Sequence, residues 1–395
     1  MELKPGYKQT EVGVIPEDWC DGPLGRHVRI TSGESPSGIR FSGSGIPYFK
    51  VEQLSNSEKY LSLFSTPYHF EKGKTVPRGS VIFAKRGAAI ALNKVRILTH
   101  ESFMDTNLMA LTPDDELDGE FLYYALGYIG LWQFADTTSV PQINNKHIKP
   151  LIFPLPPTID EQRAIATALS DVDALLDGLD RLIAKKRDLK QAAMQQLLTG
   201  KTRLPGFEGE WEVKQLGSVC SQVTTGKLDA NAMSSNGEYR FYTCAKDFCF
   251  IDNYAFDCEA LLISGNGANV GYIHYYKGKF NAYQRTYVLS GFSASIRYIQ
   301  HYLSQKLAER IEVEVKAGGT PYITRSTITE MFINLPPTNT EQCTIATVLS
   351  EMDNEIAALE QRRTKTKDIK QAMMQELLTG RVRLVSGELK MESGE

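Results

Sequence analysis

The chain has 395 residues, of which 42% are hydrophobic and 23% are charged, a composition typical of a globular protein of two or three domains. No segment reaches the roughly 18 consecutive apolar residues of a membrane span, and the N-terminus lacks the apolar stretch of a secretory signal. The net charge of -3 excludes a uniformly basic nucleic-acid binder, although a local basic surface is enough to contact phosphate. The six cysteines have neither zinc-site nor disulfide-scaffold spacing, so we expect reduced thiols in a cytoplasmic protein.

The segment from about residue 20 to 150 predicts a mixed α/β globule. The run Ser80–Ala84 predicts a strand that enters a glycine turn, and residues 120–126 predict a short helix. Candidate DNA contacts lie in two places, directly after this strand and near the end of the globule. They are Lys85 and Arg86 in the first place and Gln142, Asn144, Asn145 and Lys146 in the second. Lysine and arginine can bind phosphate or guanine edges, and asparagine can pair with adenine. For each residue taken singly, a solvated turn is the simpler alternative.

The next segment, residues 155–204, predicts one long helix. Pro156 and Pro157 mark its entry, because proline is tolerated before a helix but not inside it, and Gly200 marks its end. About 38 residues would give a rod of roughly 60 Å. Its apolar residues step by four and three, which is the seam of a coiled coil: Ile165, Leu169, Val172, Leu176, Leu179 and Ile183. An ordinary amphipathic helix is the alternative, but it predicts a shorter element.

The segment from about residue 212 to 330 predicts a second mixed α/β globule, which is rich in tyrosine. Residues 261–263 predict a strand that enters a glycine turn, and residues 296–308 predict a helix. Candidate DNA contacts are again polar residues after the strand and before the next long segment: Asn266, Asn269, Tyr322, Thr324 and Arg325. A polar turn exposed to water is the alternative here too.

The second half of the chain repeats the first. The stretch that begins at Leu155 recurs at Leu335 without a gap, with roughly 26 of 50 positions identical. The repeat predicts a second long helix whose seam holds Ile345, Leu349, Met352, Ile356 and Leu359. A weaker echo opens each half, where Trp19 precedes a Thr-Ser-Gly run at 31–33 and Trp211 precedes a Thr-Thr-Gly run at 224–226. The pattern indicates a duplicated unit, a variable globule followed by a long helix.

Motifs of catalysis are not found. The sequence contains no Walker loop, no G-x-S-x-G and no HExxH, and the glycines around Asn266 have the wrong spacing for a dinucleotide site. The run Asn334–Pro337 is interrupted by a leucine, unlike the Asn-Pro-Pro-aromatic motif of amino-methyltransferases. We therefore expect a chain that is not an enzyme and holds no metal.

The repeated pattern resembles the type I restriction-modification specificity subunits. The resemblance rests on L-P-P-x-x-E-Q-x-x-I-A-x-x-L and on a long helix ending in Q-x-L-L-T-G-(K/R)-x-R-L, each present twice. It extends to the openings Val14–Trp19 and Leu204–Trp211, to Ile46–Lys50, which adds Lys50 to the candidate DNA contacts, and to Gly318–Ile323. The first half departs from the glycine-rich version of this last motif at residues 138–142.

The resemblance implies an α+β fold: two target-recognition domains separated by two long helices, which form an antiparallel coiled coil with a pseudo-two-fold repeat. The implied boundaries are 1–150 for the first domain, 151–203 for the first helix, 204–330 for the second domain, 331–384 for the second helix and 385–395 for a flexible tail. Each domain would read half of a bipartite site in double-stranded DNA, in keeping with two heads on a rigid spacer.

The resemblance also implies partners. Two modification (methyltransferase) subunits and the restriction (motor-nuclease) subunits would dock on this chain and carry S-adenosylmethionine, Mg2+ and ATP, so that this chain binds no cofactor. The alternatives are the specificity subunit of a related type II system and, in a different class, a coiled-coil scaffold for protein binding. The target bases do not follow from the sequence, because readout depends on local shape and side-chain placement.

Overall fold

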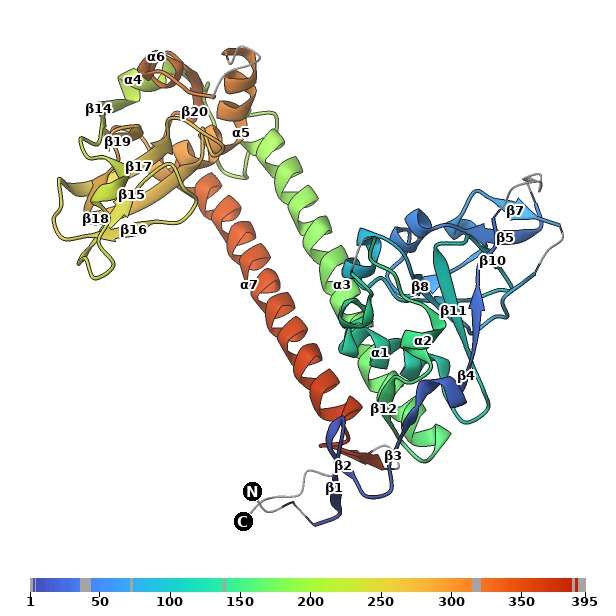
Figure 1. Ribbon diagram of the computed structural model, residues 1–395. Coiled ribbons are helices and arrows are strands. Elements are labelled where there is room, and N and C mark those ends of the chain that lie inside the picture. The colour runs from blue at the N-terminus through green and yellow to red at the C-terminus, as the bar shows by residue number, and fades with distance from the viewer. Residues whose placement is uncertain are drawn as a thin grey trace. The chain divides into compact units, whose positions relative to one another are not determined.

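The computed structural model describes residues 3, 5–35, 44–71, 74–137, 140–314, 321–385 and 388–389. The chain divides into two compact units (Figure 1), one formed by Met1–Gly178 with Arg362–Glu395 and the other by Leu179–Gln361. Each unit thus joins one mixed α/β head to parts of two long helices. The mixture of strands and helices expected from the sequence is confirmed, whereas the domain boundaries stay a prediction.

The first head (residues 20–155) belongs to the first unit, and most of its described strands lie in two sheets. A five-stranded sheet has the order β4-β11-β8-β9-β6, and a three-stranded sheet has the order β10-β5-β7. The strands are β4 (Val28–Ser32), β5 (Ile46–Phe49), β6 (Tyr60–Leu61), β7 (His69–Phe70), β8 (Val81–Ala84), β9 (Arg96–Leu98), β10 (Phe103–Met104) and β11 (Leu108–Pro113). The strand and the short helix expected near residues 80 and 120 are confirmed as β8 and α1 (Gly119–Ile129).

The two ends of the first head are paired with each other. Strand β3 (Cys20–Pro23), which opens the head, is antiparallel to β12 (Ile152–Leu155), which closes it. The short helix α2 (Asn145–Ile148) precedes β12, and the hairpin of β1 (Tyr7–Thr10) and β2 (Gly13–Pro16) precedes β3. The chain therefore enters and leaves the head at one place, directly before the first long helix.

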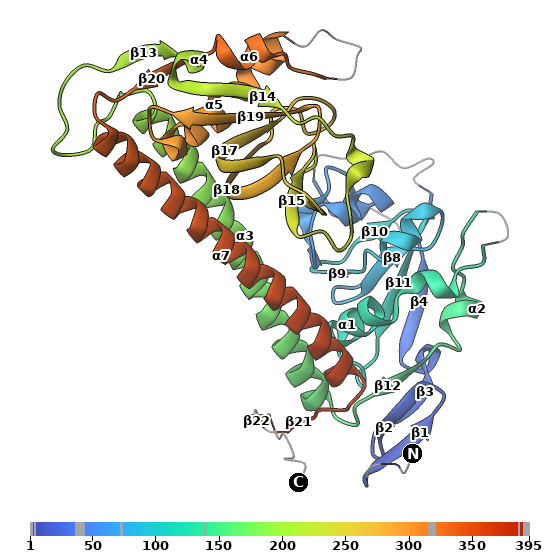
Figure 2. The same cartoon turned by 90° about the vertical axis from the view of Figure 1, so that its left-hand side faces the viewer.

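The second head (residues 212–335) belongs to the second unit and is built in the same manner. Its six-stranded sheet has the order β14-β19-β17-β18-β15-β16, with helices α4 and α6 near β14 (Figure 2). The elements are β14 (Cys220–Thr225), β15 (Tyr239–Tyr242), β16 (Cys249–Ile251), β17 (Phe256–Ser264), β18 (Ile273–Ala282), β19 (Thr286–Phe292), α4 (Leu216–Val219), α5 (Ile296–Glu314) and α6 (Arg325–Thr329). The opening strand β13 (Glu212–Gln215) pairs with the closing strand β20 (Phe332–Leu335).

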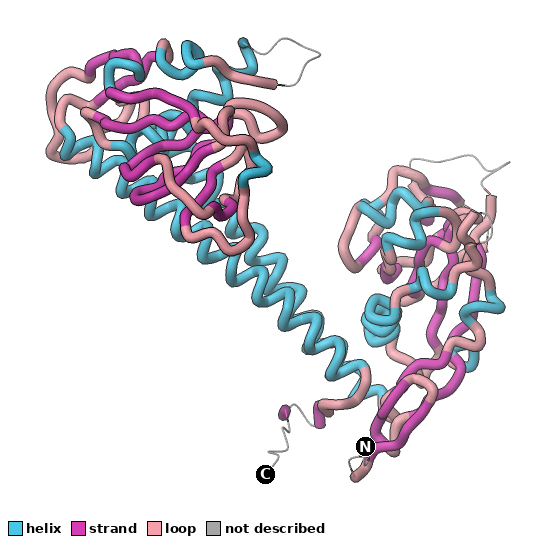
Figure 3. The backbone as a smooth tube through the Cα atoms, turned by 60° about the vertical axis from the view of Figure 1, so that its left-hand side comes forward, coloured by secondary structure: helices cyan, strands magenta, loops and turns pink. Residues whose placement is uncertain are grey.

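The two long helices are α3 (Ile159–Leu197, 39 residues) and α7 (Asn339–Leu378, 40 residues). They are continuous helices, whereas the heads consist mainly of strands and loops (Figure 3). The short strands β21 (Leu384–Val385) and β22 (Glu388–Leu389) follow α7, and the rest of the expected tail, 386–387 and 390–395, lies outside the described residues. Among the described residues, no helix combines the length and hydropathy needed to cross a bilayer.

The ends of the long helices complete the cores of the heads. Ile165 and Leu169 near the start of α3 are fully buried in the core of the first head, which also includes Leu377 and Leu378 at the end of α7. In the second unit, Ile345 and Leu349 at the start of α7 are buried with the end of α3. Burial of one such side chain stabilises a fold by about 2 kcal/mol, so each head is anchored to both helices.

The remaining seam positions differ in burial. Leu179, Ile183 and Ile356 are buried, whereas the others are only half-buried: Val172, Leu176, Met352 and Leu359. Charged pairs join α3 to α7 within the second unit: Lys186–Glu355 at 2.6 Å, Lys190–Asp353 and Arg187–Glu360. Lys370 and Asp173 form such a pair in the first unit. The middle of the helix pair is therefore held by ion pairs as well as by apolar contacts.

Candidate nucleic-acid interface

The two groups of candidate DNA contacts in the first head lie side by side. The amide of Gly87 donates to the carbonyl of Pro141 at 2.8 Å, and the amide of Ile143 donates to the carbonyl of Lys85 at 2.8 Å. Gly87 has a φ of 79°, a conformation that glycine adopts without strain. The turn after β8 is thus joined by its backbone to the segment before α2, and Lys85, Arg86, Gln142 and Asn144 share one end of the head.

The second head has the same arrangement, 180 residues further along the chain. The amide of Gly267 donates to the carbonyl of Pro321 at 2.9 Å, and the amide of Ile323 donates to the carbonyl of Gly265 at 2.9 Å. Gly267 also has a φ of 79°. The same backbone framework therefore carries Arg86 and Gln142 in one head and Asn266 and Tyr322 in the other, which are residues of different hydrogen-bonding character.

We call this surface the loop end of each head. In the first head it comprises residues 33–35, 49–50, 85–87, 105–107 and 141–146, and in the second head residues 226–228, 242–247, 265–269, 283–285 and 321–325. Sequence reasoning identified only part of it and missed the turns 105–107 and 283–285 entirely. The glycine of each Thr-Ser/Thr-Gly echo, Gly33 or Gly226, lies against these turns and was the available signal.

The candidate side chains are exposed to different degrees. Arg86, Asn145 and Lys146 are exposed in the first head, as are Tyr322, Thr324 and Arg325 in the second. The others are half-buried: Lys50, Lys85, Gln142, Asn144, Asn266 and Asn269. Several of these groups already have internal roles. Thr324 caps α6 by accepting from the amide of Thr327 at 3.2 Å, and the Asn269 amide group donates to the Cys244 carbonyl at 3.1 Å.

The loop end of the first head contains a small charge cluster. Burial lowers the pKa of Lys85, an effect that the nearby Asp105 opposes and the neighbouring Arg86 reinforces. Burial raises the pKa of Asp105, whereas the amide of Asn107 and the charge of Lys50 act in the other direction. The surface therefore offers cations next to one carboxylate, a mixture that suits selective contacts better than uniform attraction to phosphate.

The opposite end of each head, near the long helices, is closed by an arginine and a buried glutamate. Arg383, which follows α7, donates to both carboxylate oxygens of Glu161 on α3, at 2.8 and 2.7 Å, and also contacts Asp18 at 2.9 Å. Arg203, which follows α3, forms the equivalent pair with Glu341 at the start of α7. The glutamate of the E-Q sequence in one copy of the motif thus pairs with the arginine of the R-L sequence in the other copy. The role of both residues is structural.

The glutamine of that motif ties each head to its helix. The side-chain amide of Gln162 donates to the Pro156 carbonyl at 3.2 Å, and its oxygen accepts from the amide of Asp118 before α1 at 2.7 Å. Gln342 makes the corresponding bonds to Pro336 and to Ser295 before α5, each at 2.9 Å. Asp118 in the first head and Ser295 in the second therefore occupy equivalent positions in the repeat.

By the same matching, Tyr124 on α1 and His301 on α5 occupy equivalent positions in their heads. The Tyr124 hydroxyl donates to Asp173 at 2.8 Å, and burial, followed by this hydrogen bond, raises the pKa of Tyr124. His301 contacts Ser350 at 3.0 Å and lies 3.9 Å from Asp353. Burial lowers the pKa of His301 to about 4. The two heads therefore attach to their helices through the same carboxylate position but with different partners.

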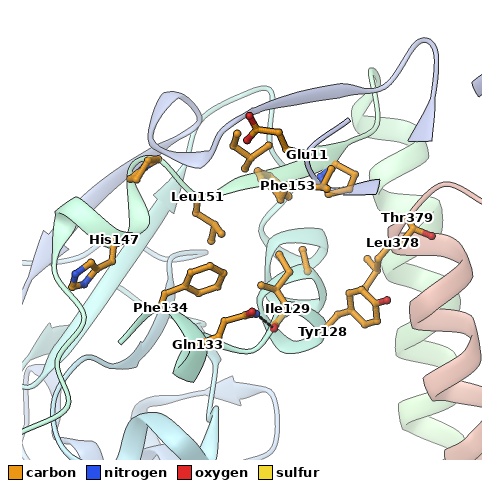
Figure 4. Close-up of a pocket in the computed structure, with 15 residues that line it drawn as sticks. Glu11, Tyr128, Ile129, Gln133, Phe134, His147, Leu151, Phe153, Leu378 and Thr379 are labelled. Atoms are coloured by element: carbon orange, nitrogen blue, oxygen red, sulfur yellow. Dashed lines mark hydrogen bonds between the residues drawn. The ribbon is translucent and has the colours of Figure 1, made fainter. Parts of the chain in front are cut away.

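A cavity and a cluster of possible metal ligands also lie in the first unit. A cavity of about 600 Å³ in the first unit is lined mainly by apolar side chains, among them Ile129, Phe134, Leu151 and Leu378 (Figure 4). His27 has its Nδ1 3.6 Å from Asp114 and 3.5 Å from Glu116. Within the described residues this is the group whose ligand atoms are close enough to hold a metal ion, and its carboxylates are exposed.

Comparison with known proteins identifies the family. A family model described as the type I restriction modification DNA specificity domain matches residues 16–185 and 208–369. The EcoDI specificity subunit of Escherichia coli is 35% identical over 175 residues, which cover 43% of this chain and 38% of that protein. A putative MjaX specificity subunit of Methanocaldococcus jannaschii is 23% identical over 96% of this chain and 97% of its own length.

A solved structure shows the same fold. The crystal structure of a type I restriction-modification S subunit from M. genitalium aligns with a TM-score of 0.64 and 18% identity over 96% of this chain and 98% of the other. The family model matches once in each half, in agreement with the internal repeat, and its two segments cover most of the chain. The chain therefore belongs to the type I restriction-modification DNA specificity family, as a specificity subunit.

Proposed function

We propose that the chain reads a bipartite DNA target with the loop ends of its two heads. The observation that carries this proposal is the repeated framework of Gly87 with Pro141 and Gly267 with Pro321, joined by equivalent backbone hydrogen bonds. A common backbone with different exposed side chains is what two readers of different half-sites require. Phosphate contacts would position each head, and contacts to base edges would select the sequence.

The proposed DNA contacts are the candidates at these loop ends. In the first head they are Lys50, Lys85, Arg86, Gln142, Asn144, Asn145 and Lys146, and in the second Asn266, Asn269, Tyr322, Thr324 and Arg325. The exposed Arg86, Lys146 and Arg325 are suited to phosphate or guanine, and the amide side chains are suited to adenine.

The long helices, on this proposal, form an antiparallel coiled coil that spaces the heads, with a pseudo-two-fold relation between the halves. The pairs Lys186–Glu355 and Lys370–Asp173 support the antiparallel direction, because residue numbers rise on one helix as they fall on the other. A spacer of constant length would fix the number of base pairs between the half-sites.

Catalysis would belong to partner subunits. We propose that two methyltransferase subunits and the motor-nuclease subunits dock on this chain and supply S-adenosylmethionine, Mg2+ and ATP, and that the isolated chain neither methylates nor cuts DNA. A type II system and a protein-binding scaffold remain the alternatives to test, although the relatives are named type I specificity subunits.

One experiment tests the proposal. The chain is purified with the methyltransferase encoded beside it, and the complex is used to methylate genomic DNA from a host without methylation. The expected result is methylation at one bipartite sequence, which is lost when the chain is omitted. Methylation without sequence preference, or methylation by the chain alone, would contradict the proposed function.

A further inference from the structure

A three-residue turn, residues 283–285, joins β18 to β19 at the loop end of the second head. Its first amide donates to the carbonyl of Tyr242 at 2.9 Å, and its second amide donates to the carbonyl of Leu228 at 2.9 Å. Its third residue accepts from the amide of Gly265 at 2.8 Å. The backbone of the turn is thus bonded to three other segments of the loop end.

The first head has the equivalent turn at residues 105–107, between β10 and β11. Its first amide donates to the carbonyl of Phe49 at 2.9 Å, and its third carbonyl accepts from the amide of Lys85 at 2.8 Å. The residue that precedes it, Met104, accepts from the amide of Glu34 at 2.9 Å. Both turns therefore occupy the same place in the framework.

Glycine permits the close approach on one side of each turn. A Cβ at Gly33 would lie 1.8 Å from the carbonyl oxygen of Asp105, and a Cβ at Gly226 would lie 1.8 Å from that of Ala282, directly before the second turn. No side chain fits in that space, so the echo seen in the sequence is explained by contact with the turn or with the residue before it. The backbone is held on this side by packing as well as by hydrogen bonds.

The side chains of the two turns are more exposed than the backbone. Gln284 and Arg285 are exposed in the second head, and Thr106 is exposed in the first. The amide group of Gln284 donates to Asp229 at 3.3 Å. Over the part of the chain that the structure describes, the guanidinium of Arg285 has no hydrogen bond or ion pair. By contrast, Thr324 and Asn269 already donate or accept within the head. An arginine without an internal partner can bind a base edge without first breaking a bond.

We propose that turns 283–285 and 105–107 are the base-reading elements of the two heads, an inference that rests on the proposed function. In the second head, Arg285 would read a guanine in the major groove, and Gln284 would exchange its bond to Asp229 for an adenine, because these side chains match those edges with two hydrogen bonds. In the first head, Asn107 would exchange its side-chain hydrogen bond with Asp105 for an adenine. A fixed backbone with exchangeable side chains lets the specificity change without a change in fold.

The test exchanges the turn 283–285 in the complex with the methyltransferase. Residues Tyr283, Gln284 and Arg285 are replaced by the Asp-Thr-Asn of the first head, and Arg285→Ala is made as a separate variant. Lys214→Ala on β13, an exposed cation outside the loop end, is the matched control. Methylated positions are mapped across genomic DNA from a host without methylation.

The expected result is a change confined to the second half-site. Arg285→Ala should lower discrimination at one base pair by roughly 5- to 140-fold, while the control keeps the wild-type pattern. An unchanged second half-site in Arg285→Ala and in the turn exchange would overturn the inference and leave the proposed function intact. If the exchanged protein does not fold, Arg285→Ala decides the matter, because it removes only an exposed side chain. Loss of sequence preference in the wild-type complex would instead contradict the proposed function.

Discussion

Arg203 donates two hydrogen bonds to the carboxylate of Glu341, from Nε at 3.0 Å and from an Nη at 2.6 Å, and the glutamate side chain is completely buried. The two residues are far apart in the sequence and close the second head where it joins its helices. Arg383 and Glu161 do the same in the first unit. Two planar groups joined by two bonds fix an angle as well as a distance.

We expect Arg203→Ala to destabilise the second unit by about 3 kcal/mol, because it leaves a buried carboxylate without its partner. Arg203→Lys should recover only part of this loss, since lysine does not bind both oxygens in the same plane. Urea unfolding of the full chain gives the measurement. The control is Lys306→Ala, which removes an exposed pair with Glu309 and should change stability by less than about 1 kcal/mol. Equal effects of the two alanine variants would contradict the structural role of the pair.

Acid should weaken the second unit through His301. Its pKa is lowered to about 4 by burial, whereas an unfolded histidine titrates near 6.5. Between these values the unfolded chain binds a proton that the folded chain does not, so the free energy of unfolding falls as the pH falls from about 6.5 to 4. One proton contributes at most about 1.4 kcal/mol per pH unit.

The measurement is unfolding at several pH values, in wild type and in His301→Tyr. Tyrosine is chosen because Tyr124 occupies the matching position in the first head and donates to Asp173. The pKa of His274 is also lowered by burial, so some pH dependence will remain in the variant. The prediction concerns the difference between the two proteins: His301→Tyr should reduce the slope, and identical slopes would show that His301 is not the titrating group.

Removal of cations at the loop ends should weaken DNA binding. A double Lys85→Ala and Arg86→Ala variant, or Arg325→Ala, is titrated with target DNA at several salt concentrations. A lost phosphate contact makes the salt dependence shallower by about one unit of slope per contact. Loss of discrimination with an unchanged slope would instead identify base readout, and no effect would indicate a solvated turn.

The helices should set the gap between the half-sites. Four residues inserted near Gly178, with four more near Ala358, add roughly 6 Å of rise, and base pairs are stacked ~3.4 Å apart. We expect a gap longer by one or two base pairs with unchanged half-sites, read from the methylation pattern of cells that carry the variant. The insertion is a stutter that locally unwinds a coiled coil without destroying it. An active variant with the original gap would show that another part of the protein measures the DNA.

Much of the architecture could be predicted because it depends on local patterns. The long helices follow from apolar spacing, prolines at the entry and a glycine at the end, all of which act within a few residues. The strand at β8 and the helix α1 were likewise predicted from short runs. The predicted contact seam between the two helices was less complete. Ile165 and Leu169, which were assigned to the seam, pack into the core of the first head. Apolar spacing shows that one face of a helix is buried, but it does not show which neighbour covers that face.

By itself, then, the sequence determined the duplication, the two long helices and the polar turns after equivalent strands. These features depend on apolar spacing and on prolines and glycines within a few residues of one another. The tertiary structure alone decided that residues 85–87 are bonded both to 141–143 and to the turn 105–107, and that Arg203 reaches Glu341. The physical reason is that such contacts are backbone hydrogen bonds and ion pairs between distant segments. Most side chains permit these backbone bonds, so apart from glycines such as Gly33 and Gly226 the local sequence does not indicate them.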